Sequence, residues 1–159
     1  MEDCITLRPA ELQDVRNIHL LLHEYALEGV LLDRSEDDIT FYLKNFTVAV
    51  DKDNSLLGCM AVRDFGNDLL EVRSLAVQRG LRKSGIGRKL IAKAIARLGA
   101  ERSDYRLFAL TLQPGFFEKL GFKVVEKELF PEKIWADCVH CPKRDRCDEI
   151  AVIYYGNMA

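Results

Sequence analysis

The stretch that decides the fold is EVRSLAVQRGLRKSGIGRKLIAKAI, residues 71–95. Its first part reads as a strand that ends at Val77, and a loop with two glycines follows. Apolar residues then recur at helical spacing, which predicts a helix over about 84–98. Because the first turn of a helix leaves N–H groups unpaired and carries a partial positive charge, the loop is a candidate phosphate site. The apolar stripe of the helix consists of Ile86, Leu90, Ala94, Ile95 and Leu98.

Two familiar phosphate loops do not fit this sequence. Gly80 and Gly85 have the separation of the pattern G-x-x-x-x-G-K-[ST], but Ile86 stands where the lysine is required. Gly85 and Gly87 begin the dinucleotide pattern G-x-G-x-x-G, but Leu90 takes the place of the third glycine. The glycines by themselves are equally compatible with a plain helix start that has a flexible entry.

The segments on either side of this stretch predict a mixed sheet. Residues 46–50, 56–62 and 69–77 read as strands, and the short turns between them make their pairings antiparallel. A strand over 107–112 is expected parallel to 69–77, because a right-handed crossover joins the two. The fold class is therefore α/β with an α+β mixed sheet, which combines an antiparallel meander with a parallel crossover. Helices are expected on both faces of the sheet, and residues 1–159 are expected to form a single domain. The other expected elements are strands over 5–8, 122–125 and 150–154, helices over 11–28 and 114–121, and a short helix capped by Ser35 and Asp38.

The composition is that of a soluble globular chain. Among its 159 residues, 48% are hydrophobic and 30% are charged. A net charge of -2 argues against nucleic acid as a partner, and no apolar run is long enough to span a bilayer. The start of the sequence lacks the apolar core of a signal peptide, so a cytoplasmic location is expected. Five cysteines, an odd number, suggest reduced thiols or a metal site instead of a disulfide framework.

The run VRSLAV followed by R-x-x-G-x-G resembles the acetyl-CoA loop of the GNAT acetyltransferases, whose pattern is [QR]-x-x-G-x-[GA]. Arg82, Gly85 and Gly87 match that pattern, and FFEKLGF (116–122) matches the later F-[YF]-x-x-x-G-F helix of the family. The resemblance implies the GNAT acyl-CoA N-acyltransferase fold and acetyl-CoA as co-substrate. It implies that backbone amides of the loop hold the pyrophosphate. The residues that contribute these amides are Arg82, Lys83, Ser84, Gly85, Ile86, Gly87 and Arg88.

The same resemblance assigns the end of the preceding strand to the acetyl group. Amides near Leu75 and Val77, with Ala76 between them, are implied to bond the acetyl carbonyl and the pantetheine arm. A fixed amide donor there stabilises the oxyanion that forms as an amine attacks. Phe117 is a further implied cofactor contact, and it stands where the family usually has its general-acid tyrosine.

A narrower resemblance is to the N-acetylglutamate synthases, and it rests on GVLLDRSEDD (29–38), GCMAVR (58–63), EVRSLAV, LFALT (107–111) and FFEKLGF. The C-terminal PEKIWADCVHCPKRDRCDEIAV (131–152) resembles the short, stand-alone bacterial members of that family. Those enzymes acetylate the α-amine of L-glutamate, the entry step of arginine biosynthesis. Small domains of this kind are often dimers, so a homodimer is one expected state.

The two carboxylates of glutamate require cations. Arg34, Arg63 and Lys133 are the candidates that the resemblance offers, although each also reads as a solvated surface cation. The α-amine must lose a proton before it attacks, and Glu71, in an apolar strand, is the candidate catalytic base. The alternative for Glu71 is a structural ion pair with Arg73 or Arg63.

The cysteines near the end of the chain form a dense cluster, Cys138-x-x-Cys141 and Cys147. Three thiolates lack one ligand of a tetrahedral zinc site, so zinc binding, a Cys138–Cys141 disulfide and reduced thiols all stay open. Cys59 lies in an apolar strand and is expected in the core. Two alternatives to glutamate acetylation also stay open: acetylation of another small amine or a peptide N-terminus, and a catalytically weak acetyl-CoA-binding regulatory module.

Overall fold

The strands of the sheet follow the order β1-β2-β3-β4-β5-β7-β6 in the computed structural model, which describes residues 4–81, 83–129 and 149–157. Contacts within the chain define two compact units. The first comprises Met1–Val62 and Val72–Arg97, and the second comprises Arg63–Glu71 and Leu98–Ala159. Strand β4 (Leu69–Val77) and helix α3 (Ile86–Glu101) contribute residues to both units.

The first unit contains the antiparallel part of the sheet. β1 (Thr6–Pro9) pairs with β2 (Phe46–Val50), which pairs with β3 (Leu56–Asp64). The predicted antiparallel pairing of the second and third strands is confirmed, since Phe46 lies opposite Ala61. Pro9, one residue beyond the predicted strand over 5–8, belongs to β1, which an edge strand tolerates because one side needs no N–H donor.

Two helices follow β1 in this unit. α1 (Val15–Leu27) begins four residues later than predicted, because a 3-10 turn over Leu12–Asp14 precedes it. α2 (Glu36–Phe41) begins at the predicted cap: the Oγ of Ser35 accepts a hydrogen bond from the amide of Asp38 at 3.0 Å. Short 3-10 turns at Leu43–Asn45 and Arg79–Leu81 complete the unit.

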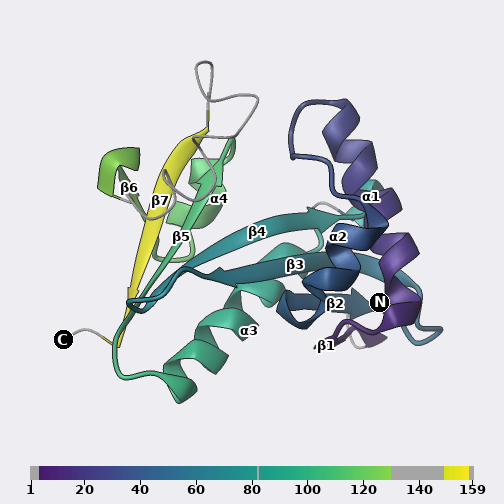
Figure 1. Ribbon diagram of the computed structural model, residues 1–159, viewed down its shortest axis with the longest axis horizontal. Helices are drawn as coiled ribbons and strands as arrows, with labels where there is room; N and C mark the ends of the chain where they lie inside the picture. The colour runs from purple at the N-terminus through teal and green to yellow at the C-terminus, as the bar shows by residue number, and fades with distance from the viewer. Residues whose placement is uncertain (1–3, 82, 130–148, 158–159) are drawn as a thin grey trace. The chain divides into compact units, whose positions relative to one another are not determined.

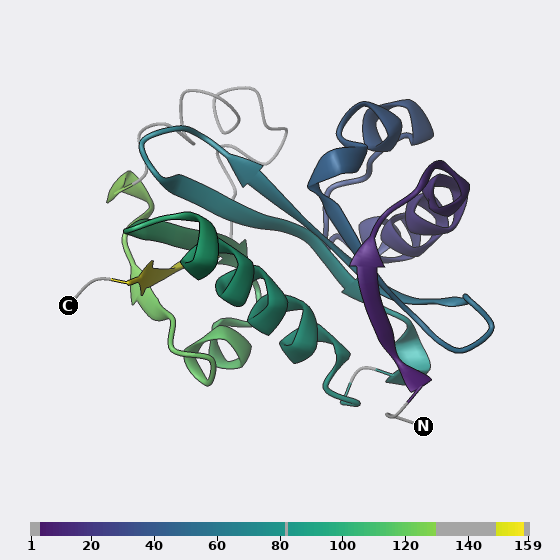
Figure 2. The same cartoon turned by 90° about the horizontal axis from the view of Figure 1, so that it is seen from below.

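The two faces of this sheet are covered by different helices, as Figures 1 and 2 show. Cys59 and Ala61 of β3 belong to the apolar cluster formed with α1 and α2. Gly58, one position away, faces α3, because a Cβ placed on it would lie 3.1 Å from Cγ2 of Ile86. Helices on both faces, as predicted, follow from this alternation. The residues of the cluster that come from α1 and α2 are Val15, Ile18, Leu21, Leu22, Tyr25 and Ile39.

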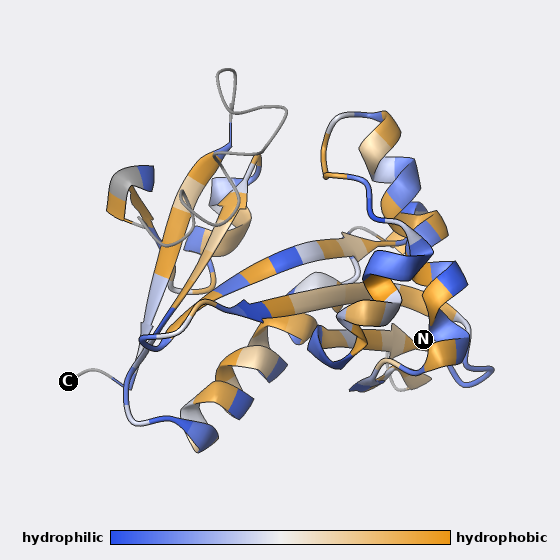
Figure 3. Ribbon diagram, viewed as in Figure 1, coloured by the Kyte–Doolittle hydropathy of each residue, from blue (hydrophilic) through white to orange (hydrophobic). Residues whose placement is uncertain are grey.

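Helix α3 has the predicted apolar stripe, except that Ile91 takes the buried position predicted for Ile95. Ile91 is fully buried, whereas Ile95 is only half-buried. The helix continues to Glu101, three residues beyond the predicted end. Asn157 closes it, since its Nδ2 donates to the carbonyls of Gly99 and Arg102. Figure 3 shows the polar and apolar faces along α3.

The second unit contains the parallel crossover. β5 (Tyr105–Thr111) pairs in parallel with the start of β4, as predicted, with Glu71 opposite Phe108. β7 (Ile150–Gly156) pairs antiparallel with β5 and with the edge strand β6 (Lys123–Val125). α4 (Pro114–Glu118) and a 3-10 turn over Lys127–Leu129 lie between β5 and β7 in the chain. The buried core of this unit contains Leu69, Phe108, Ala151 and Ile153.

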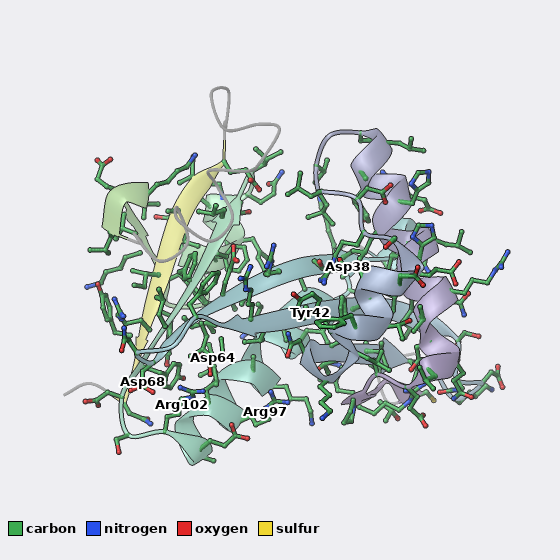
Figure 4. The ribbon with its side chains drawn as sticks, viewed as in Figure 1. Asp38, Tyr42, Asp64, Asp68, Arg97 and Arg102 are labelled. Carbon is green, nitrogen blue, oxygen red and sulfur yellow. The ribbon has the colours of Figure 1, made fainter. Side chains whose placement is uncertain are left out.

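An ion-pair cluster fixes the turn between β3 and β4 in the second unit. Arg102 donates to Asp64 and to Asp68, both at 2.8 Å, and Figure 4 labels these three side chains. Burial raises the pKa of Asp64, but hydrogen bonds from the Gly66 amide and from Arg102 outweigh it, so the pKa lies below its usual value. The β3–β4 connection is therefore held to the end of α3.

Candidate functional site

The residues predicted for the site divide between the two units. The acetyl-CoA loop, the end of β4 and Arg34 belong to the first unit, whereas Arg63, Glu71 and Phe117 belong to the second. The remaining predicted residues lie outside the described part of the chain: Arg82, Lys133, Cys138, Cys141 and Cys147.

The loop before α3 has the backbone geometry of an anion cradle. Gly85 has a φ of +88°, a value that L side chains rarely adopt, and nothing lies within 4 Å of a Cβ placed there. The amide of Lys89 donates to the carbonyl of Gly85 at 3.0 Å, which opens the hydrogen-bond ladder of α3. The amides of Ile86, Gly87 and Arg88 precede this bond, so the helix itself does not use them. These three donors suit a phosphate oxygen.

Hydrogen bonds inside the loop fix its path toward this cradle. The amide of Leu81 donates to the carbonyl of Gln78 at 2.8 Å. Both donors of Ser84 go to the carbonyl of Leu81, the amide at 3.1 Å and the Oγ at 2.5 Å. Ser84 therefore shapes the loop instead of lining the anion site, which refines its predicted role. The buried side chain of Ile86 anchors the start of α3, so this residue offers the site its amide alone.

Two cationic residues flank the glycines of the loop in the sequence. The side chains of Lys83 and Arg88 are exposed, one on each side of the two glycines. Solvent-exposed cations add attraction for an anion without the cost of burying a charge. The loop thus combines directed amide donors with a positive field.

Ser74 departs from regular strand geometry and was not predicted from the sequence. It has a φ of +51° within β4, a region that a non-glycine residue occupies at a cost in strain. Its carbonyl accepts a hydrogen bond from Cys59 Sγ at 3.5 Å, and its Oγ accepts one from Arg34 Nη1 at 3.3 Å. Beyond it Ala76 is buried, while Leu75 and Val77 are half-buried. The break in geometry falls immediately before the predicted acetyl-binding amides.

Arg34 is held in place and is not a solvated surface cation. Its Nε donates to Asp38 at 2.6 Å, its guanidinium lies 5.0 Å from the ring centroid of Phe46, and its side chain is only 14% exposed. Figure 4 labels Asp38 together with Tyr42, whose ring also lies beside the guanidinium at 5.7 Å. Asp38 and Ser74 use two of the five guanidinium N–H groups. The others have no acceptor within the described residues, so this fork has the donors to bind a carboxylate.

The second unit holds the predicted base. Glu71 is 4% exposed on β4, so its carboxyl group lies in the protein interior. The guanidinium of Arg63 lies 4.4 Å from the ring centroid of Phe65. Phe117 is buried and packs edge-on against Phe122, with 5.1 Å between the ring centroids. Its contact with a cofactor stays a prediction.

Cys59 lies in the core, as predicted. It is fully buried in β3, and burial raises the pKa of its thiol to about 12. Among residues 4–81, 83–129 and 149–157, no group of three His, Cys, Asp or Glu side chains is placed to hold a metal. No helix in those ranges is both long and apolar enough to cross a membrane.

Comparison with known proteins gives a consistent result. A family model described as an acetyltransferase (GNAT) domain matches residues 37–124. An uncharacterized N-acetyltransferase of Chlorobaculum tepidum is 45% identical over 147 residues, which cover 92% of this chain and 94% of that protein.

Two longer proteins share this region. The amino-acid acetyltransferase of Neisseria meningitidis serogroup A is 29% identical over 133 residues, 82% of this chain and 30% of that protein. The N-acetylglutamate synthase of Neisseria gonorrhoeae, solved with coenzyme A and N-acetyl-glutamate, has a TM-score of 0.83 and 26% identity. That likeness covers 95% of this chain and 35% of the synthase, so the chain spans about a third of either longer protein.

Proposed function

Because the chain belongs to the GNAT family of acetyltransferases, we propose that it transfers the acetyl group of acetyl-CoA to the α-amine of L-glutamate. The family fixes the class of reaction, acetyl transfer from acetyl-CoA to an amine. The acceptor is the proposed part, and arginine biosynthesis in the cytoplasm is the setting that this acceptor suggests. The likeness to amino-acid acetyltransferases and to a synthase bound to N-acetyl-glutamate supports it.

The loop before α3 supports acetyl-CoA as the co-substrate. Its positive-φ Gly85 leaves open space at the backbone, and the amides of Ile86, Gly87 and Arg88 provide donors for the pyrophosphate. We assign the amides of Leu75 and Val77 to the acetyl carbonyl and the pantetheine arm. Both follow Ser74, the residue of β4 with a positive φ.

The contacts of Arg34 support glutamate as the acceptor. A guanidinium that is fixed by Asp38, stacked on Phe46 and hydrogen-bonded to Ser74 of β4 lies at the strand assigned to the acetyl group. A planar fork with further N–H donors binds a carboxylate in two places at once, which a flexible surface cation does not. We propose that Arg34 pairs with one carboxylate of the acceptor, and that Arg63 and Lys133 contribute to the other.

Glu71 is the proposed base. A glutamate α-amine is mostly protonated at pH 7, so a base must take its proton before attack, and the Glu71 carboxylate can do so directly or through water. The amine nitrogen then bonds to the acetyl carbon, and a backbone amide of β4 stabilises the oxyanion. The C–S bond breaks to release the CoA thiolate, and the attacking nitrogen gives up its surplus proton to water or to that thiolate, which leaves a neutral amide. Phe117 has no hydroxyl group, so the thiolate receives no proton from that position.

The test is CoA-thiol release with glutamate, glutamine, the other amino acids and a peptide N-terminus as acceptors. Glutamine keeps the shape of glutamate but leaves the pairing cation without its counter-charge, which costs on the order of 2–5 kcal/mol. We therefore expect kcat/KM for glutamate to exceed that for glutamine by at least ~30-fold, at ~1.4 kcal/mol per factor of ten. Equal rates with the two would overturn glutamate as acceptor.

The other outcomes separate the remaining functions. Turnover with another amine and none with glutamate would show a GNAT enzyme with a different acceptor. Binding of acetyl-CoA by titration, with no turnover on any amine, would show the regulatory module instead. A size measurement in solution tests the expected homodimer separately.

A further inference from the structure

A polar cluster joins the end of α1 to the segment that follows β4, within the first unit. The guanidinium of Arg79 lies 4.5 Å from the ring centroid of Tyr25. Its Nη2 is 2.5 Å from the Oε2 of Glu28, and its Nε is 3.9 Å from the Oε2 of Glu24. Arg79 is thus held against one turn of α1 by two carboxylates and an aromatic face.

Tyr25 connects this cluster to the end of β4. Its side chain is buried, with 6% of the residue exposed, and its hydroxyl donates to the carbonyl of Val77 at 2.6 Å. The next residue is fixed as well, because the amide of Gln78 donates to the carbonyl of Leu57 at 2.9 Å. The last peptide of β4 is therefore tied to α1 on one side and to β3 on the other.

The hydrogen bonds continue from this peptide to the cradle. The carbonyl of Gln78 accepts from Leu81, the carbonyl of Leu81 accepts from Ser84, and Gly85 follows directly. A shift of the Val77 carbonyl would therefore move the start of α3, whose amides are assigned to the pyrophosphate. Each link in this chain is a short, directed contact.

We infer that Tyr25 is a positioning residue for acetyl-CoA binding, with Arg79 clamping its ring against α1. The inference rests on the proposed function of the loop as the acetyl-CoA cradle. The brace formed by Tyr25 and Arg79 sets the loop in its binding geometry before the co-substrate arrives, so less ordering is required on binding. Neither residue needs to touch the co-substrate for this effect.

Tyr25→Phe removes the hydroxyl and keeps the ring. By titration calorimetry we expect the Kd for acetyl-CoA to rise about fivefold, the usual net value of one hydrogen bond. At saturating acetyl-CoA, kcat should stay within about twofold, because the catalytic groups are intact. This division between binding and turnover is what a positioning role predicts, whereas a purely structural role would lower the melting temperature alone.

Arg79→Gln gives an independent test, because the side chain is 38% exposed and its loss does not threaten the core. We expect a smaller rise in Kd, partly reversed in Arg79→Lys, which keeps the charge for Glu28. Tyr105→Phe is the matched control, because Tyr105 is as buried a tyrosine as Tyr25, at 1% exposed, and lies in the second unit. It should lower stability and leave the Kd unchanged.

The outcomes distinguish the inference from the function on which it rests. A wild-type protein that binds acetyl-CoA, with unchanged Kd in both Tyr25→Phe and Arg79→Gln, overturns the brace and leaves the acetyl-CoA cradle intact. A wild-type protein that does not bind acetyl-CoA overturns the cradle assignment, and the brace with it. An equal rise in Kd for Tyr105→Phe also overturns the brace, because the effect would then be one of general stability.

Discussion

Arg34 and Ser74 are 40 positions apart in the sequence, and Nη1 of Arg34 donates a hydrogen bond to Oγ of Ser74 at 3.3 Å. The bond ties the segment before α2 to the one residue of β4 that has a positive φ. It brings a guanidinium to the strand assigned to the acetyl group. The acceptor specificity proposed above depends on this pair.

Arg34→Lys should therefore lower kcat/KM for glutamate by at least about tenfold, while the Kd for acetyl-CoA changes less than about twofold. Lysine keeps the charge but loses the planar fork that binds a carboxylate and pairs with Asp38 at the same time. Steady-state kinetics with glutamate and calorimetry with acetyl-CoA measure the two effects separately. Arg16→Lys is the control, since Arg16 is exposed on α1, and it should leave both values unchanged. Wild-type kcat/KM in Arg34→Lys would remove Arg34 from the acceptor site.

Gly85→Ala should weaken acetyl-CoA binding roughly tenfold with little loss of stability. No atom lies within 4 Å of the added Cβ, so the cost is that of the backbone at a φ of +88°, about 1–2 kcal/mol. The loop avoids this cost by leaving the geometry that presents the amides of α3. Calorimetry with acetyl-CoA and thermal melting measure the two effects.

Gly80→Ala is the matched control for this change. Gly80 lies in the same loop and also has open space around its Cβ position, but its φ does not lie in the positive range. Its substitution should leave the Kd for acetyl-CoA unchanged. Similar losses in both variants would mean that any side chain in the loop disturbs binding, and that the positive φ of Gly85 is not the cause.

Local patterns explain which parts of the fold the sequence predicts well. The bounds of β2 and β4 agree with the prediction, because both are apolar runs that turn residues delimit. The cap at Ser35 was predictable, because Asp38 follows it three positions later. The start of α1 was placed too early, because Asp14, which is held by Arg8 and by the amide of Glu11, keeps the preceding turn in a 3-10 conformation.

The site was harder to predict because its decisive contacts are not local. Serine carries no preference for positive φ, so no pattern marks Ser74. Phe46 and Ser74, which hold Arg34, lie 12 and 40 positions away, so the sequence could not tell a fixed guanidinium from a solvated one. The same holds for Tyr25 and Val77, which are separated by 52 positions.

The cysteine cluster, which lies outside the described residues, gives a test of metal binding. If Cys138, Cys141 and Cys147 bind zinc, the purified protein should contain near-stoichiometric zinc, and Cys141→Ser should lose it. Cys59→Ala should retain the metal, because Cys59 is buried in β3 with a thiol pKa of about 12. Elemental analysis of the wild type, Cys141→Ser and Cys59→Ala measures the zinc content of each. A metal-free wild type with a reducible Cys138–Cys141 bond would support the disulfide instead.

Gly156→Ala should destabilise the protein by about 1–3 kcal/mol, the usual cost of overpacking a core. A Cβ at Gly156 would fall within the ring of Tyr105, so the ring or the strand has to move. Gly99→Ala, in α3, is the control: its Cβ would lie 3.6 Å from Oδ1 of Asn157, an ordinary contact, and alanine favours a helix. Urea unfolding should show a loss for the first variant and no loss for the second. Equal stability of the two would contradict the packing of Tyr105 against β7.

Asp14→Asn should destabilise the fold near neutral pH by about 2 kcal/mol, because Arg8 loses a charged partner that it binds through two hydrogen bonds, at 2.7 and 3.0 Å. Burial raises the pKa of Asp14, but hydrogen bonds from Arg8 and from the amide of Glu11 and the charge of Arg8 outweigh it, so the pKa lies below its usual value. The carboxylate therefore stabilises the fold fully above the unfolded-state pKa of about 4, and this contribution is lost as the pH falls through the lower folded-state pKa.

The difference in unfolding free energy between wild type and Asp14→Asn should accordingly be constant from about pH 5 to 7 and shrink below about pH 4. Urea unfolding across this range measures it. Asp53→Asn, at an exposed position in the β2–β3 turn, is the control and should show no comparable loss at neutral pH. A difference that persists unchanged at pH 3 would mean that the shape of the side chain, and not its charge, stabilises the turn before α1.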